Sequence, residues 1–106
     1  MDKIKFNFNH SEMQGVKMMV QEWLFDYENS NDYEHILSAI LLQRLFKKLA
    51  EKLVMRKAKY SFSLPMEQAL VLLIHQRNTA YESVFMQNLQ VTLINNIAPK
   101  VESIII

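Results

Sequence analysis

The sequence lacks cysteine altogether and holds only one glycine and two prolines among its 106 residues. Without cysteine, neither a disulfide framework nor a thiolate metal site can form. The scarcity of glycine and proline, in a chain that is half hydrophobic, excludes a disordered or low-complexity protein. This composition predicts one globular domain, residues 1–106, that is rich in regular structure.

Long hydrophobic runs are also absent. The run ALVLLI at residues 69–74 is far shorter than the about 20 residues that a membrane-spanning helix needs. The opening MDKIKFNFNH has no apolar stretch of the kind found in a signal peptide. We therefore expect a cytoplasmic protein with no membrane partner.

Residue patterns that support catalysis are missing too. Because Gly15 is the single glycine, the chain has no glycine-rich phosphate loop. His10, His35 and His75 fall in three different predicted elements without metal-ligand spacing, so we expect each to be a cap or surface residue. The acidic residues between 22 and 34 lack the glycine and the oxygen spacing of a hard-cation loop. The sequence predicts a protein that is not an enzyme and that uses no cofactor and no metal.

Two heptapeptides, KIKFNFN at residues 3–9 and KAKYSFS at residues 57–63, alternate between polar and apolar side chains. A period of two with aromatic residues is typical of a β-strand that buries one face. The predicted inner faces consist of Ile4, Phe6 and Phe8, and of Ala58, Tyr60 and Phe62. The predicted outer faces consist of Lys3, Lys5, Asn7 and Asn9, and of Lys57, Lys59, Ser61 and Ser63.

The helical spacing of apolar residues predicts four helices. They are expected over residues 11–28, over residues 32–56, from Pro65 as a first helical residue, and from residue 81 to Pro99. Each of three pairs has a polar side chain three residues before a glutamate or glutamine, as in a capping box. The predicted caps are Ser11 with Gln14, Asn31 with Glu34, and Thr79 with Glu82.

The chain therefore reads as strand, helix, helix, twice over. The two heptapeptides lie 54 residues apart, and residues 33–53 resemble residues 81–101 after a shift of 48. A loop that is six residues shorter in the second half accounts for the difference between the two shifts. These matches predict two pseudo-symmetric repeats, residues 3–56 and 57–100. The alternative is a chance similarity of short segments.

A lone strand has no partners for its backbone N–H and C=O groups. The simplest arrangement pairs the two strands antiparallel across a pseudo-two-fold axis and backs them with four helices, because an unbacked two-stranded ribbon is marginally stable. The predicted fold class is mainly α with a small β-ribbon. Residues expected in the core are Phe6, Phe8, Trp23, Leu41, Leu45, Tyr60, Phe62, Leu73 and Leu89. Leu70, Leu73 and Ile74 are expected to form the apolar stripe of the third helix.

This element order, and the stretch KYSFSLPMEQALVLLI at residues 59–74, resemble the ribbon-helix-helix DNA-binding repressors, here as a tandem fused duplication. In that family the ribbon enters the DNA major groove and its outward side chains read base edges. The resemblance implies a transcriptional regulator with double-stranded DNA as its partner. The implied DNA-binding residues are Lys3, Lys5, Asn7, Lys57, Lys59 and Ser61, with Thr79 as a phosphate contact.

Charge is unevenly placed, although the net charge is only +1. Residues 12–34 carry a net −5 and residues 44–59 a net +6. Such asymmetry can mark a polyanion partner, and it also arises from solvated faces that offset each other. The alternative function is a helical protein-interaction or oligomerisation module. In that case the basic helix 44–56 or the apolar tail 101–106 binds a protein partner or a second copy.

Overall fold

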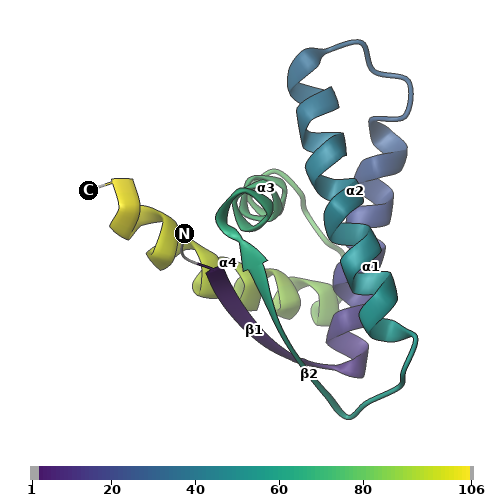
Figure 1. The fold of residues 1–106 in the computed structure, drawn as a ribbon, viewed down its shortest axis with the longest axis vertical. Helices are drawn as coiled ribbons and strands as arrows, with labels where there is room; N and C mark the ends of the chain where they lie inside the picture. Colours follow the sequence, from purple (N-terminus) through teal and green to yellow (C-terminus); the bar gives the residue numbers. More distant parts are fainter. Residues whose placement is uncertain (1–2, 106) are drawn as a thin grey trace. The chain divides into compact units, whose positions relative to one another are not determined.

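The computed structural model describes residues 3–105, with side chains up to residue 103. Over this range the protein is mainly helical, with four helices that hold 69% of the chain and a small two-stranded antiparallel sheet. The elements are β1 (Lys3–Asn9), α1 (His10–Asp26), α2 (Tyr33–Leu53), β2 (Lys59–Pro65), α3 (Met66–Arg77) and α4 (Val84–Ile105) (Figure 1). This confirms the predicted fold class at that level. Within residues 3–105, no helix is long and apolar enough to cross a membrane.

The described chain divides into two compact units. The hairpin unit, Phe8–Tyr60, contains α1 and α2, which contact each other and are joined by a short loop at residues 27–32 (Figure 1). The C-terminal unit, residues 3–7 with 61–105, contains α3 and α4, which also contact each other. Each strand contributes residues to both units.

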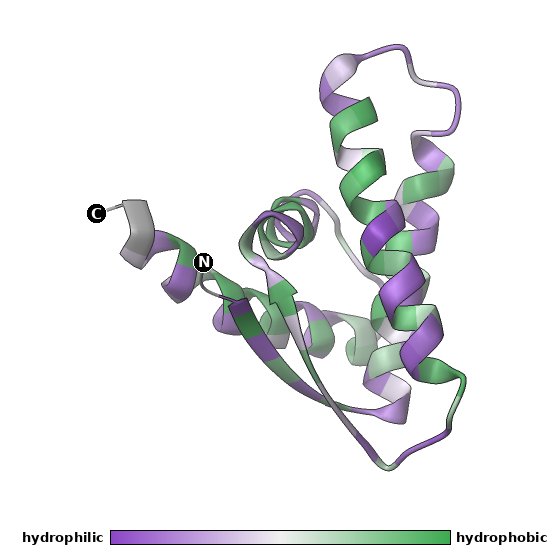
Figure 2. Ribbon diagram, viewed as in Figure 1, coloured by the Kyte–Doolittle hydropathy of each residue, from purple (hydrophilic) through white to green (hydrophobic). Residues whose placement is uncertain are grey.

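Strand β1 forms where the sequence predicts it. Its side chains alternate between exposed and buried along the whole strand, and the same alternation is visible in its hydropathy (Figure 2). Ile4, Phe6 and Phe8 are almost completely buried, as predicted. Such burial on one face fixes the register of the strand, since a slip of one residue would expose all three side chains.

Strand β2 begins two residues later than predicted and ends two residues later. Lys57 and Ala58 lie before the strand and are exposed, so their predicted strand positions, including the inward position of Ala58, are wrong. The reason is a local turn closed by Tyr60, whose hydroxyl accepts a hydrogen bond from the Lys57 backbone N–H at 2.9 Å and donates one to the Met55 carbonyl at 2.9 Å. Leu64, fully buried, completes the inner face instead of Ala58.

Helix α1 starts directly at the end of β1, without an intervening loop. Its cap is Asn9 and not Ser11: the Asn9 side chain accepts a hydrogen bond from the Glu12 backbone N–H at 2.8 Å. The Glu12 carboxylate in turn accepts one from the Asn9 backbone N–H at 2.9 Å, which completes the capping box. The predicted pair Ser11 and Gln14 is therefore wrong by two residues.

Helix α2 is capped by Asp32, whose carboxylate accepts from the Glu34 backbone N–H at 2.8 Å, and not by the predicted Asn31. Its buried row is Leu42, Leu45 and Leu49. Leu41, which was expected in the core, is only half-buried, because the buried row advances by three and then four residues instead of by four throughout.

Helix α3 begins at Met66. Pro65 is the last residue of β2 and the N-cap residue of α3. The prediction that Pro65 is the first helical residue is therefore wrong by one position. The helix is apolar around most of its circumference, which made its inward face ambiguous. Leu73 is buried as predicted, whereas Leu70 and Ile74 are partly exposed. His75 is buried and bonds to the Val71 carbonyl through Nδ1 at 2.8 Å, so its predicted surface position is wrong.

Helix α4 starts later and ends later than predicted. Ser83 caps it by accepting a hydrogen bond from the Met86 backbone N–H at 3.0 Å, so the predicted cap of Thr79 with Glu82 is wrong. The helix continues through Pro99 to Ile105. Pro99 has no backbone N–H, so the Asn95 carbonyl lacks the donor that it would have in a regular helix. Water can donate to this carbonyl instead, because Asn95 and Pro99 are both exposed.

Residues 101–105 thus continue α4 and do not form a separate segment. The prediction of an apolar interaction tail at 101–106 falls partly outside the described residues, since side chains are described only to residue 103 and Ile106 is not described. The other predicted core residues are confirmed. They are Phe6, Phe8, Trp23, Leu45, Tyr60, Phe62, Leu73 and Leu89.

Candidate nucleic-acid interface

The outward row of β1 includes three of the predicted DNA-binding residues, and Asn9, the cap of α1, is its fourth member. Lys3, Lys5 and Asn7 are all exposed, and they alternate with the buried row of the same strand. Successive side chains of a strand point to opposite faces, so these three share one face. That face offers two ammonium groups and one amide to solvent, all of them groups that can bond to base edges or phosphates.

The register of the two strands follows from the aromatic pair below that face. The Phe6 and Phe62 rings stack with centroids 5.4 Å apart and an interplanar angle of 21°. From this stack we infer that Phe6 lies opposite Phe62 in the antiparallel pair, which puts Asn7 opposite Ser61. Ser61 is exposed, and so adds a hydroxyl beside the Asn7 amide on the outward face.

The remaining predicted DNA-binding residues are Lys57 and Lys59. Lys59 is the first residue of β2 and is exposed, in line with its predicted outward position. Lys57 is exposed but lies in the turn before β2, and its backbone N–H is held by Tyr60. The structure therefore places five of the six predicted residues on the strands and Lys57 outside them.

Tyr60 anchors the entry to β2 within the hairpin unit. Besides its two backbone bonds in the preceding turn, its hydroxyl lies 3.0 Å from His10 Nδ1 at the start of α1, with the two rings 6.0 Å apart. The single hydroxyl proton of Tyr60 goes to the Met55 carbonyl, so His10 Nδ1 must be the donor in their bond. The sequence predicted only a buried ring here, because nothing in the alternating pattern distinguishes tyrosine from phenylalanine.

The predicted phosphate contact, Thr79, does not lie at a helix start. Its hydroxyl donates to the His75 carbonyl at 2.7 Å, at the C-terminal end of α3. Its own carbonyl accepts a hydrogen bond from the Gln90 side chain at 2.7 Å. The N-terminal backbone N–H groups of α4 begin several residues later, at Val84, so the helix-start argument for a phosphate contact at Thr79 is wrong.

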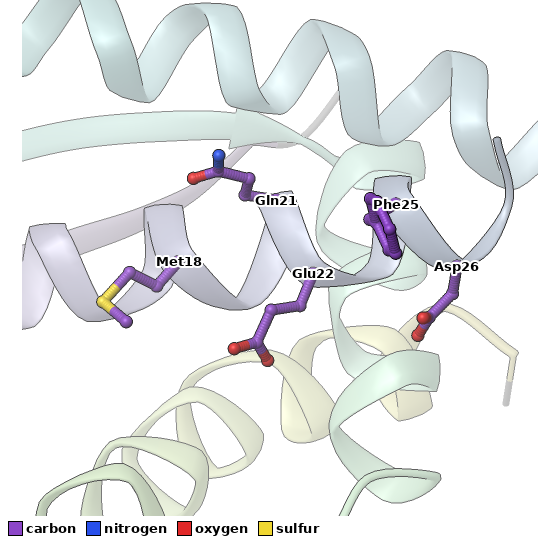
Figure 3. Close-up of a pocket in the computed structure, with 5 residues that line it drawn as sticks. All are labelled: Met18, Gln21, Glu22, Phe25 and Asp26. Carbon is purple, nitrogen blue, oxygen red and sulfur yellow. The ribbon is translucent and has the colours of Figure 1, made fainter.

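A surface hollow of about 520 Å³ lies along helix α1 (Figure 3). The side chains that line it project from α1 in two rows, Met18, Glu22 and Asp26 on one side, and Gln21 and Phe25 on the other (Figure 3). Two apolar side chains beside two carboxylates do not form a catalytic arrangement. Among the residues that the structure describes, no group of three or more histidine, cysteine, aspartate or glutamate side chains could hold a metal ion.

Comparison with known proteins identifies no relative: no protein-family model, no curated protein and no solved structure matches this chain.

Proposed function

We propose that this protein is a non-enzymatic DNA-binding protein of the transcriptional-regulator type, which presents the β1–β2 ribbon to the major groove. The observation that carries the proposal is an antiparallel two-stranded ribbon with one buried aromatic face and one exposed face of lysine, asparagine and serine. The major groove of B-DNA admits a two-stranded ribbon of this kind.

The chemistry of the exposed face suits base reading. Lysine can donate to guanine O6 and N7, and asparagine can pair with adenine through its amide. Lys5 and Asn7 occupy consecutive outward positions of β1, and Ser61 lies opposite Asn7 on β2. Lys3 and Lys59 occupy outer positions of the same face, where we expect them to contact phosphates. Because phosphate contacts position a protein and base contacts specify the sequence, the two groups have separable roles.

The finer architecture is part of the same proposal. The element order is strand, helix, helix in each half. With Phe6 opposite Phe62, Asn7 lies opposite Ser61, which is also its equivalent after the shift of 54 residues. We infer that residues 3–56 and 57–100 are pseudo-symmetric repeats, as in a tandem version of the ribbon-helix-helix repressors, with the ribbon backed by all four helices. One chain then supplies both strands of a ribbon that two chains form in that family.

A pair of neutralising variants tests the proposal. The double change Lys5→Gln with Lys59→Gln removes two ribbon charges and leaves the buried face intact, so the protein should fold. Affinity for duplex DNA should fall, and the slope of log K against log salt should become less steep by about 0.9 for each phosphate that the protein no longer neutralises. Removal of a hydrogen bond to a base should cost about 1–3 kcal/mol at that base position only.

The matched control is Lys52→Gln with Lys100→Gln, which removes the same charge from exposed positions on α2 and α4. The control should keep most of the affinity. Equal reductions in affinity for the two variants would show diffuse electrostatic binding and contradict ribbon reading. If the unmodified protein fails to bind DNA even at low salt, the alternative applies, a helical protein-interaction or oligomerisation module.

A further inference from the structure

The hairpin unit exposes large apolar side chains next to the loop that joins its helices. Leu37 is 60% exposed and Phe25 is 75% exposed, with Ile36 and Ile40 also well exposed. Three of these four belong to α2, and they fall within residues 35–43, a stretch without any acidic or basic residue except His35. Ile36, Leu37 and Ile40 lie within about one turn of α2, and exposed apolar side chains that gather in this way mark an interaction surface.

A groove runs between α1 and α2 beside these side chains. It has a volume of about 340 Å³ and is lined from α1 by Leu24 and from α2 by Ile36, Ala39 and Ile40, among others. Ile40 therefore lies both at the groove and at the exposed surface. An apolar side chain from a partner could fill this groove, and the groove alone does not say which partner.

The distribution of charge along the α1–α2 hairpin favours a second copy of the chain as the partner. Helices α1 and α2 lie side by side and are joined at one end by their loop (Figure 1). The closed end, residues 22–34, carries a net −5 with no lysine or arginine, while residues 44–53 of α2, toward the open end, carry a net +3. The apolar stretch 35–43 separates the two. Along the hairpin the charge thus changes from negative, through an apolar stretch, to positive. A second copy of the hairpin in the opposite orientation would place its positive end beside this negative end, and its negative end beside this positive end.

We propose that two copies of this chain associate through their α1–α2 hairpins, packed antiparallel with Ile40 near the two-fold axis. A two-fold interface uses the same patch on both partners, so every contact occurs twice. With the axis near Ile40, Arg44 and Lys47 of one copy lie beside the acidic closed end of the other, where Glu28 and Glu34 are exposed. The apolar stretches of the two copies then cover each other.

The size of the surface suits a reversible dimer. Helix α2 has 21 residues, which gives a length of about 31 Å, and two adjacent helices are about 20 Å wide. The projected face is about 600 Å², whereas a standard stable interface buries about 800 Å² per partner. We expect a dissociation constant on the order of micromolar, which rises with salt because exposed charges contribute to the interface.

The proposal goes beyond DNA binding and does not depend on it, since no ribbon residue takes part. The test is sedimentation equilibrium of the full chain without DNA, at concentrations up to about 200 µM, which spans micromolar affinities. The unmodified protein should form a dimer that weakens at high salt. Ile40→Glu should weaken it at least tenfold, whereas the control Val91→Glu, at an exposed position of α4 in the other unit, should leave it unchanged.

A charge-exchange pair separates association from folding. The basic-end variant Arg44→Glu with Lys47→Glu and the closed-end variant Glu28→Lys with Glu34→Lys should each be monomeric. Mixed in equal amounts, they should form a heterodimer of about wild-type affinity, because both ends again place opposite charges together. A monomeric wild-type protein at the highest concentration would overturn the proposal. So would single variants that dimerise normally, or a mixture of folded variants that stays monomeric.

Discussion

Truncation of Phe62 tests the ribbon's inner face most directly. Phe62 is 5% exposed and stacks on Phe6 across the sheet. Burial of a side chain of this size contributes about 2–3 kcal/mol, and a stacked aromatic pair adds about 0.5–1.5 kcal/mol. With the cavity that remains, Phe62→Ala should lower the free energy of unfolding by about 3–5 kcal/mol.

Thermal unfolding followed by far-ultraviolet circular dichroism measures this decrease. For a domain of this size each kcal/mol lowers the midpoint by about 4–8 °C, so the midpoint should fall by at least about 12 °C. The control Ser61→Ala, on the outward face next to Phe62, should change stability by less than about 0.5 kcal/mol. Phe6→Ala should cost a similar amount to Phe62→Ala, and the double variant should cost less than the two single changes together. A midpoint that Phe62→Ala leaves unmoved would refute the assignment of the inner face.

Three further predictions concern single interactions. Asn9→Ala removes the acceptor of the Glu12 backbone bond and should cost about 1 kcal/mol in urea unfolding; no change would contradict the cap. Tyr60→Phe leaves the Lys57 N–H without its acceptor and should lower the free energy of unfolding by about 1–3 kcal/mol. Proteolysis of the turn before β2 should be faster; an unchanged rate of proteolysis would contradict the role of Tyr60 in the turn. Burial raises the pKa of Tyr27 above its usual value, so its stabilising contribution is complete below pH 10 and is lost as pH rises through the raised pKa. The difference in phenolate ultraviolet absorbance between the unmodified protein and Tyr27→Phe should show that Tyr27 titrates above pH 10; a difference that titrates at or below pH 10 would contradict the raised pKa.

Much of the fold follows from periodicity alone. The alternation in β1 is strict, and both the strand and its buried face lie where the pattern predicts them. The long leucine-rich segment forms α2 within three residues of the predicted bounds. These features are robust because burial of one face or one stripe acts over many residues at once.

The errors arise where a single hydrogen bond decides between neighbours. Asn9 and Ser11 are both good cap residues, and the end of strand pairing selects Asn9. In β2 the turn held by Tyr60 delays the strand past Ala58. The hydrophobic pattern of the sequence does not depend on either hydrogen bond. The pattern therefore predicts the order of the helices and strands correctly, but their end residues only to within a few positions.

The candidate site shows the same division. The outward positions of Lys5 and Asn7 follow from alternation, whereas Lys57 and Thr79 depended on boundaries that the structure moves. The charge split of the hairpin is visible in the sequence. The sequence does not show that Ile40 is exposed between the two charged ends, because α2 has apolar residues on several sides. Only the burial of each side chain in the structure shows which of these residues are exposed.

The most direct test of the proposed function is binding of the unmodified protein to a labelled random-sequence duplex at two salt concentrations, followed by fluorescence anisotropy. Three lysines on the ribbon face, Lys3, Lys5 and Lys59, predict a log–log slope of about −2.7, if each neutralises one phosphate. Affinity should therefore fall by about 40-fold when salt rises fourfold, from about 50 to about 200 mM. Absence of binding at the lower salt concentration would contradict DNA binding by the ribbon.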